Sequence, residues 1–215
     1  MSGTCLEQLD TRLATAPIVP LIAENDAERA VETALALKAG GLSVIEVVLR
    51  SENALAGLDA IRCADADLIV GAGTVLTLDQ LAAARSAGAQ FIVSPGLLDP
   101  IAELCLAENI PVFPGVMTAG EVQRAYAMGL RTVKFFPASL AGGVPMLKAF
   151  AAVFRDMRFM PTGGISAGNL VDYLALPSVL ACGGSWLTPR GAEPEVTQGL
   201  AREALAIAAT ARPSG

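Results

Sequence analysis

Short apolar runs rich in β-branched residues recur along the chain, and polar segments separate them. Runs of this length and composition are typical of strands that are buried on both faces of a parallel sheet. We predict a strand in each of eight runs: Ile18–Ile22, Leu42–Leu49, Leu68–Val70, Phe91–Val93, Val112–Phe113, Thr132–Phe136, Phe159–Met160 and Val179–Ala181.

Amphipathic stretches rich in Ala and Leu lie between these runs. Most of them open with Asn, Ser, Thr or Asp, whose side chains can accept hydrogen bonds from the free N–H groups of a first helical turn. We predict eight helices that begin near Asn25, Ser51, Thr77, Asp99, Thr118, Gly143, Ser166 and Glu193, and a short additional helix over Thr4–Thr15.

The alternation gives eight strand–helix units in 215 residues. Such alternation predicts a parallel sheet covered by helices, and eight units favour closure into a (β/α)8 TIM barrel. We therefore expect residues 1–215 to form a single-domain α/β barrel with a short extra N-terminal helix. The alternative is an open doubly wound sheet, but no GxGxxG follows the first strand, and Gly71–Gly73 is only a fragment of that pattern.

Histidine is absent from the whole chain. This absence excludes Ser-His-Asp and Cys-His nucleophile pairs, histidine general bases and metal sites that need imidazole. Any chemistry must therefore use carboxylates, lysine, cysteine, hydroxyl groups or backbone dipoles. The formal net charge of −6 and the lack of a basic stripe disfavour nucleic-acid binding.

Four cysteines are present, and none belongs to a CxxC pair. Their spacing in a chain of this length predicts reduced cysteines rather than a disulfide framework. No apolar run approaches the ~20 residues of a membrane span, and the first residues lack the pattern of a secretory signal. We expect a cytoplasmic protein that does not associate with membranes.

Two of the predicted strands contain a charge among β-branched or aromatic neighbours, at Glu46 and Lys134. An unpaired buried charge is costly, so opposite charges from two strands that point to the barrel axis would offset each other. A purely structural ion pair is one interpretation. The functional interpretation is favoured, because barrel enzymes keep their reactive groups at the carboxyl ends of strands. The other two lysines, Lys38 and Lys148, lie in helix-like stretches and are predicted to be surface charges.

Burial of a lysine disfavours its ammonium form, and the neutral amine can attack a carbonyl to form a Schiff base. The resulting iminium is an electron sink for the cleavage of an adjacent carbon–carbon bond. Such chemistry also needs a proton shuttle, which Glu46 could provide if it lies within reach. No histidine, metal or cofactor is required.

Two Gly-Gly pairs follow the last two predicted strands, at Gly163-Gly164 and Gly183-Gly184. Glycine lets a backbone approach a ligand closely, and consecutive N–H groups attract an anion. Loops after strands seven and eight of (β/α)8 enzymes often bind phosphate, so we predict a phosphate site here. Tight turns without a ligand are the alternative.

With these motifs in hand, the sequence resembles the class I aldolases that cleave 2-keto-3-deoxy-6-phosphogluconate and 4-hydroxy-2-oxoglutarate. The likeness runs from about Pro17 to Ala208. It is carried by the segments Ile45–Arg50, Val70–Val75, Ser94–Gly96, Val133–Ala138, Pro161–Ile165 and Gly183–Trp186.

The resemblance implies a homotrimeric barrel that needs no metal or cofactor, with small-molecule partners: a phosphorylated 2-keto-3-deoxy sugar acid and pyruvate. It implies Lys134 as the Schiff-base residue and Glu46 as the general acid/base. The remaining implied substrate-binding residues are Arg50 and Thr74 for the carboxylate, Pro95 and Phe136 for the pyruvate moiety, Thr162 as in the gluconate-type enzymes, and Gly163, Gly164, Gly184 and Ser185 around the phosphate.

The main expectation is reversible cleavage of 2-keto-3-deoxy-6-phosphogluconate to pyruvate and glyceraldehyde 3-phosphate. A 4-hydroxy-2-oxoglutarate aldolase or an aldolase for the galactonate epimer is the alternative within the same chemistry. A non-catalytic barrel that binds a sugar phosphate is the alternative from another class, and a metal-dependent aldolase is a further one.

Overall fold

The apolar runs form parallel strands in a computed structural model, which describes residues 5–211. The first predicted strand has the bounds that the sequence suggested, and most of the others differ by one to three residues at an end. The strands are β1 Ile18–Ile22, β2 Val44–Val48, β3 Ile69–Gly73, β4 Ile92–Val93, β5 Val112–Phe113, β6 Gly115–Val116, β7 Thr132–Phe135, β8 Arg158–Pro161 and β9 Cys182–Gly184.

All predicted helices are present, including the additional one near the N-terminus, whose first predicted residue, Thr4, lies outside the described residues. Asp26, Thr77 and Thr118 accept hydrogen bonds from the third residue that follows each of them and so cap three of the helices. The helices are α1 Cys5–Thr15, α2 Ala27–Ala39, α3 Ala54–Ala64, α4 Leu78–Ser86, α5 Asp99–Ala107, α6 Ala119–Ala127, α7 Gly143–Val153, α8 Leu170–Leu174 and α9 Pro194–Ala211.

The strands pair in two parallel sheets, a six-stranded one of order β5-β4-β3-β2-β1-β9 and a three-stranded one of order β6-β7-β8. This confirms the α/β class and the parallel sheet, but the number of strands differs from the prediction. The fifth predicted strand, Val112–Phe113, has its predicted bounds, and an unpredicted strand, β6, follows it after Pro114. Pro114 has no N–H to donate, and its carbonyl oxygen accepts a hydrogen bond from Lys134 N at 2.9 Å. Two isolated bridges, Phe159 to Val179 and Thr162 to Gly183, join the sheets at β8 and β9. The single closed ring of eight strands stays a prediction.

The last strand was predicted too early along the chain. The run Val179–Ala181 contributes only an isolated bridge, and β9 comprises the Cys-Gly-Gly that follows it, paired with β1 from Ile18 to Pro20. Glycine has a low strand propensity, so the sequence pattern favoured a turn where β1 in fact provides a pairing partner.

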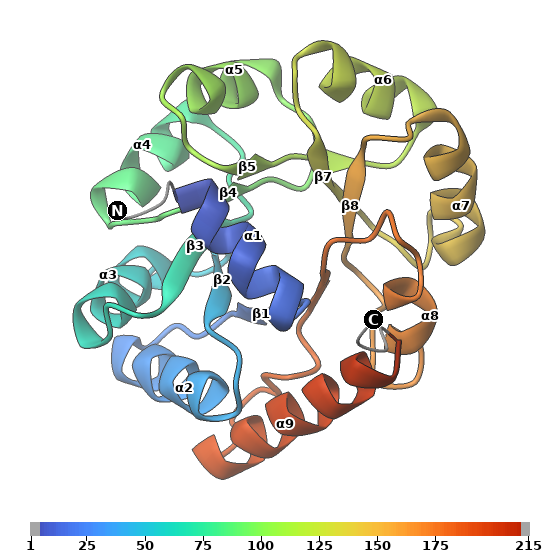
Figure 1. The fold of residues 1–215 in the computed structure, drawn as a ribbon. Helices are drawn as coiled ribbons and strands as arrows, with labels where there is room; N and C mark the ends of the chain where they lie inside the picture. Colours follow the sequence, from blue (N-terminus) through green and yellow to red (C-terminus); the bar gives the residue numbers. More distant parts are fainter. Residues whose placement is uncertain (1–4, 212–215) are drawn as a thin grey trace.

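Side chains alternate between two apolar cores along each strand. Ile45 and Val47 belong to the larger core, between the strands and the outer helices, whereas Val44 belongs to a smaller inner core on the opposite face of the strands. Figure 1 shows helices α2 to α9 around the strands and α1 across one end. Leu9 and Leu13 of α1 join the inner core and are at most 1% exposed, so α1 closes this end.

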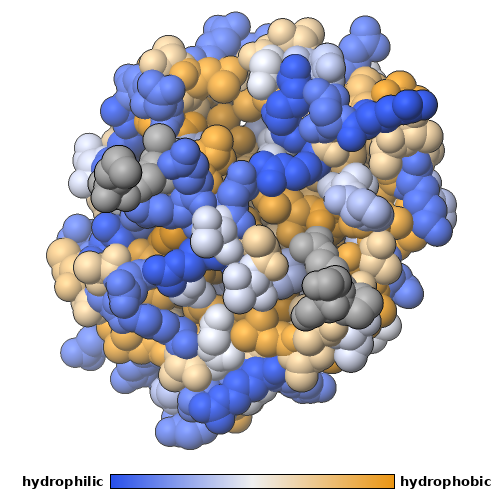
Figure 2. Space-filling model, in the orientation of Figure 1, coloured by the Kyte–Doolittle hydropathy of each residue, from blue (hydrophilic) through white to orange (hydrophobic). Residues whose placement is uncertain are grey.

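The face that α1 covers has polar side chains across it with apolar residues between them (Figure 2). Within residues 5–211 no helix has the length and apolar character needed to cross a membrane.

Candidate active site

Glu46 and Lys134 meet on the side of the strands that faces the smaller core. They lie on β2 and β7, in different sheets, and Lys134 Nζ is 3.5 Å from Glu46 Oε1. Glu46 is 0% exposed and Lys134 is 3% exposed. The structure therefore brings together the two strand charges that the sequence singled out.

The alternation of side chains explains why both groups point inward. Val44 belongs to the inner core, and Glu46 follows it at the two-residue period of a strand. On β7, Val133 and Phe135 belong to the outer core, so Lys134 between them faces the interior. Gly73 lies beside Glu46, and a Cβ at this glycine would overlap Glu46 Oε1. The absence of a side chain there makes room for the carboxylate.

Both carboxylate oxygens of Glu46 are buried, and neither has a hydrogen-bond partner among residues 5–211. Its ionic partner is Lys134, whose Nζ also lies 5.3 Å from the centroid of the Phe136 ring, within cation–π range. Buried polar groups are usually hydrogen-bonded, so a carboxylate in this state points to a functional site.

A second polar pair lies near the carboxyl ends of β2 and β3. Arg50 Nε donates to Thr74 Oγ1 at 3.2 Å. Thr74 has a φ of +61°, in the left-handed region, which costs a β-branched residue about 1–3 kcal/mol. Strain of this kind is common at binding sites, and the geometry leaves the planar end of the Arg50 guanidinium available for a carboxylate.

A cavity of about 170 Å³ collects most of the predicted substrate-binding residues. Of the predicted site residues, Glu46, Lys134, Thr74 and Pro95 are not part of its lining. The carbonyl oxygen of Pro95 packs against Gly115, which is in register with Lys134. The lining consists of Leu21, Ala23, Val48, Arg50, Phe136, Thr162, Gly163, Gly164, Ile165, Gly184, Ser185 and Thr188.

The Gly-Gly turn after β8 adopts a conformation that requires glycine. Gly163 and Gly164 have φ angles of +95° and +79°, and within the described part of the chain their N–H groups have no hydrogen-bond acceptor. Consecutive N–H groups of this kind form a site for an anion. Close packing holds the turn, since a Cβ at Gly164 would overlap Ser139 and one at Gly183 would overlap Thr162.

Comparison with known proteins decides the family. The pattern of the family described as KDPG and KHG aldolase matches residues 9–198. The chain belongs to this aldolase family.

Among characterised members, the KHG/KDPG aldolase of Escherichia coli K12 is 49% identical over 180 residues, which are 84% of each chain. The 2-dehydro-3-deoxy-phosphogluconate aldolase of Dickeya dadantii is 47% identical over 207 residues, 94% of this chain and 96% of the relative. The crystal structure of the 2-keto-3-deoxy-6-phosphogluconate aldolase of Zymomonas mobilis ZM4 with 3-phosphoglycerate has a TM-score of 0.88 at 42% identity, covering 93% of this chain and 95% of the other.

The KDPG aldolase of Legionella pneumophila, solved with pyruvate captured as a covalent carbinolamine intermediate, has a TM-score of 0.83 at 37% identity, covering 94% of this chain and 96% of the other. Within residues 5–211 of this aldolase-family member, no group of three or more Cys, Asp or Glu side chains could hold a metal ion.

Five lining residues of the cavity were not predicted: Leu21, Ala23, Val48, Ile165 and Thr188. The aliphatic ones look like core positions in the sequence. Thr188 is placed by tertiary structure, because its Oγ1 donates to the carbonyl oxygen of Leu21 at 2.7 Å across 167 positions. No local signal distinguishes such a threonine from any other loop threonine.

Proposed function

We propose that this protein is a class I aldolase that reversibly cleaves 2-keto-3-deoxy-6-phosphogluconate to pyruvate and glyceraldehyde 3-phosphate. The observation that carries the proposal is the buried Lys134–Glu46 pair, with Nζ and Oε1 3.5 Å apart and both side chains at most 4% exposed. Membership of the family supports the lyase activity.

Lys134 is the nucleophile in this mechanism. Its neutral amine attacks the C2 keto carbon, and Glu46 relays the protons by which the carbinolamine loses water and becomes an iminium. Glu46 then accepts the proton of the C4 hydroxyl group while the C3–C4 bond breaks. The bonding electrons move into the iminium, which leaves an enamine on Lys134 and releases the aldehyde. Protonation of the enamine carbon and hydrolysis of the new iminium then release pyruvate and free Lys134.

The surrounding residues hold the two ends of the substrate. Arg50, oriented through Thr74, binds the carboxylate, and Pro95 and Phe136 pack against the pyruvate moiety. Thr162 contacts the middle of the substrate. The phosphate is held at Gly163, Gly164, Gly184 and Ser185, and the free N–H groups of the Gly163–Gly164 turn support this assignment.

The fold that we propose for residues 1–215 is a single closed (β/α)8 barrel domain. The two isolated bridges at β8 and β9 and the ring of helices in Figure 1 support closure.

Exposed apolar side chains follow three strands at the same end: Leu76 after β3, Leu98 after β4 and Met117 after β6. Such a surface suits the burial that a homotrimer would provide. A cytoplasmic location fits the reduced cysteines of the sequence.

A second candidate substrate is 4-hydroxy-2-oxoglutarate, because the Escherichia coli relative is named for both activities. The deciding experiment measures pyruvate release from the 6-phosphogluconate derivative, its galactonate epimer and 4-hydroxy-2-oxoglutarate, each before and after exhaustive chelation. We expect the highest kcat/KM for the gluconate derivative and no loss after chelation. No pyruvate from any substrate, with sugar-phosphate binding unchanged in Lys134→Met, would instead establish a non-catalytic barrel.

A further inference from the structure

A polar hollow of about 640 Å³ adjoins the cavity that Arg50, Gly163 and Ser185 line, and the two share Ala23 and Thr188. Thr188 N donates to the carbonyl oxygen of Ser185 at 3.2 Å, so the hollow lies beside a residue of the proposed phosphate site. Its remaining lining residues are Glu24, Asn25, Asp26, Asn53 and Arg190. Arg190 is the cation of this lining, and it is exposed.

The segment that carries Arg190 is fixed at both ends. On one side, Thr188 Oγ1 donates to the carbonyl oxygen of Leu21 at 2.7 Å. On the other side, an Arg29 guanidinium nitrogen donates to the carbonyl oxygen of Ala192 at 2.8 Å. Between these anchors Ala192 N donates to the carbonyl oxygen of Pro189 at 3.0 Å and closes a β-turn. Gly191 has a φ of +72°, as the third residue of a type II turn requires, and Arg190 is at its outer corner.

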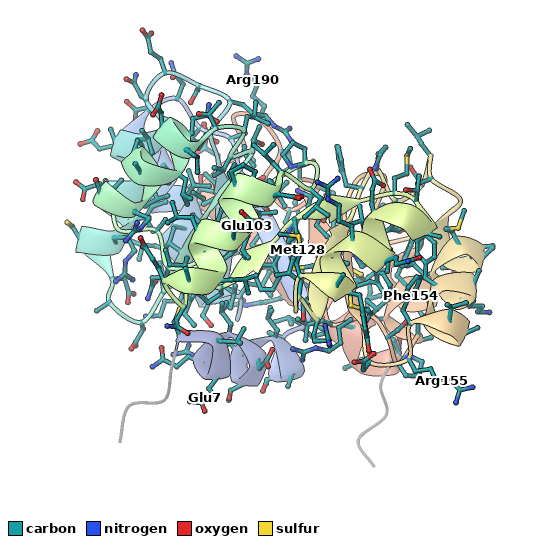
Figure 3. The ribbon with its side chains drawn as sticks, turned by 90° about the horizontal axis from the view of Figure 1, so that it is seen from above. Glu7, Glu103, Met128, Phe154, Arg155 and Arg190 are labelled. Carbon is teal, nitrogen blue, oxygen red and sulfur yellow. The ribbon has the colours of Figure 1, made fainter. Side chains whose placement is uncertain are left out.

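Arg190 has a fixed backbone but no ion pair within residues 5–211. Glu24 and Asp26 line the same hollow without pairing with it, and Asp26 Oδ1 instead accepts from Arg29 N at the start of α2. Figure 3 shows Arg190 at the end of the molecule opposite Glu7 of α1. An unpaired guanidinium in the hollow beside the cavity is available to an anionic ligand.

The net negative charge of the whole molecule makes the position of the Arg190 guanidinium relevant to an anionic substrate. The chain has a formal net charge of −6, and the proposed substrate carries a carboxylate and a phosphate of about −2 charge. The protein as a whole therefore repels its substrate, and a local cation in the hollow beside the cavity raises the rate of productive encounter.

We propose that Arg190 is a specificity-determining residue, whose guanidinium attracts the phosphate of the incoming substrate and so favours phosphorylated over unphosphorylated sugar acids. This inference rests on the proposed function. It concerns the entry and binding of the substrate, and the bond-breaking steps are left to Lys134 and Glu46.

The test compares Arg190→Ala, Arg190→Lys and Arg155→Ala with the unchanged enzyme. Arg155 is a matched control, since it is also exposed, has no ion pair in the described structure and lies at the end of the molecule near α1 (Figure 3). Pyruvate release is measured with 2-keto-3-deoxy-6-phosphogluconate and with the same sugar acid without phosphate. For the phosphorylated substrate we expect Arg190→Ala to lower kcat/KM about tenfold through KM, with kcat retained.

Arg190→Lys should keep most of kcat/KM, and Arg155→Ala should keep all of it. Added salt should reduce kcat/KM for the phosphorylated substrate more steeply in the unchanged enzyme than in Arg190→Ala. The inference is overturned if kcat/KM depends equally on salt in the unchanged enzyme and in Arg190→Ala. It is also overturned if Arg190→Ala leaves kcat/KM unchanged for both substrates, or lowers it by the same factor for both. An unchanged enzyme that releases no pyruvate from the phosphorylated substrate would instead contradict the proposed function.

Discussion

At the scale of single residues, the site depends on glycines as much as on its charged groups. The burial and pairing of Lys134 and Glu46 could be predicted from the sequence, because a charge inside an apolar strand is conspicuous. Gly73 could not, because its importance comes from β3 lying next to β2, where Gly73 is in register with Val48 and beside the Glu46 carboxylate. In the sequence, Gly71–Gly73 stood out only as a fragment of a GxGxxG pattern.

Gly73→Ala should reduce activity without unfolding the protein. The added Cβ would overlap Glu46 Oε1, so the carboxylate must move away from its position near Lys134. A misplaced general acid/base costs about 10²-fold in kcat. Gly120→Ala is the control, because a Cβ at Gly120 meets nothing within 4 Å. Steady-state pyruvate release measures kcat, and circular dichroism shows that each variant is folded. Equal kcat values for the two variants would refute the role assigned to Gly73.

The cysteines should differ strongly in reactivity. Burial raises the pKa of the Cys105 thiol to about 11, an effect that the charge of Arg85 offsets in part, whereas Cys63 is exposed. At pH 8 about a thousandth of Cys105 is thiolate, which is the reactive form. Iodoacetamide followed by peptide mapping should find Cys63 modified in the folded protein and Cys105 modified only after denaturation. Comparable labelling rates for the two thiols in the folded state would contradict this account.

At the scale of elements, local signals predicted helices better than strands. Helices carry their own start signals, and the clearest is the capping box of α6, where Thr118 and Glu121 bond each other's backbone N–H groups. Strand bounds depend on partners distant in sequence. Neither the extra strand β6 nor the position of β9 could be predicted, because both depend on pairing with β7 and β1.

The capping box predicts a pH-dependent contribution to stability. Burial opposes ionisation of Glu121, but hydrogen bonds from Met117 N, Thr118 N and Thr118 Oγ1 outweigh it and hold the pKa below its ordinary value of 4.5. The carboxylate therefore stabilises the folded state above pH 4.5, and this contribution is lost as the pH falls through the lower folded-state value.

Thr118→Ala should lower the free energy of unfolding by about 1 kcal/mol at neutral pH. The difference from the unchanged protein should shrink as the pH falls below the titration of Glu121. Urea unfolding across a pH series measures both effects. A difference in unfolding free energy that grows toward acid pH would contradict the stabilising contribution of the ionised Glu121 carboxylate.

At the scale of the whole molecule, the proposed substrate site and helix α1 lie at opposite ends. Arg190, which lines the hollow beside the cavity, lies at one end, and Glu7 of α1 lies at the other (Figure 3). Helix α1 packs against the inner core through Leu9 and Leu13, which belong to the same cluster as Val19 and Val44. Stability and chemistry should therefore respond to different substitutions.

Leu13→Ala tests this separation. Leu13 is 0% exposed, so truncation leaves a cavity and should cost about 2–5 kcal/mol of unfolding free energy. The KM for the substrate should not change at a temperature where the variant is folded. Urea unfolding and initial rates on the same preparation provide the two readouts. A raised KM with unchanged stability would contradict the division between the ends.

The central claim is that Lys134 forms the covalent intermediate. Lys38 is a poor candidate, because its hydrogen bond to Asp65, 2.5 Å from Nζ to Oδ2, raises the pKa of its ammonium group. Lys148 is exposed on α7. Borohydride reduction in the presence of pyruvate, followed by peptide mapping, measures the site of attachment directly. The account predicts one stable pyruvyl adduct, on Lys134 and absent when pyruvate is omitted. An adduct on Lys38 or Lys148, or none at all, would contradict it.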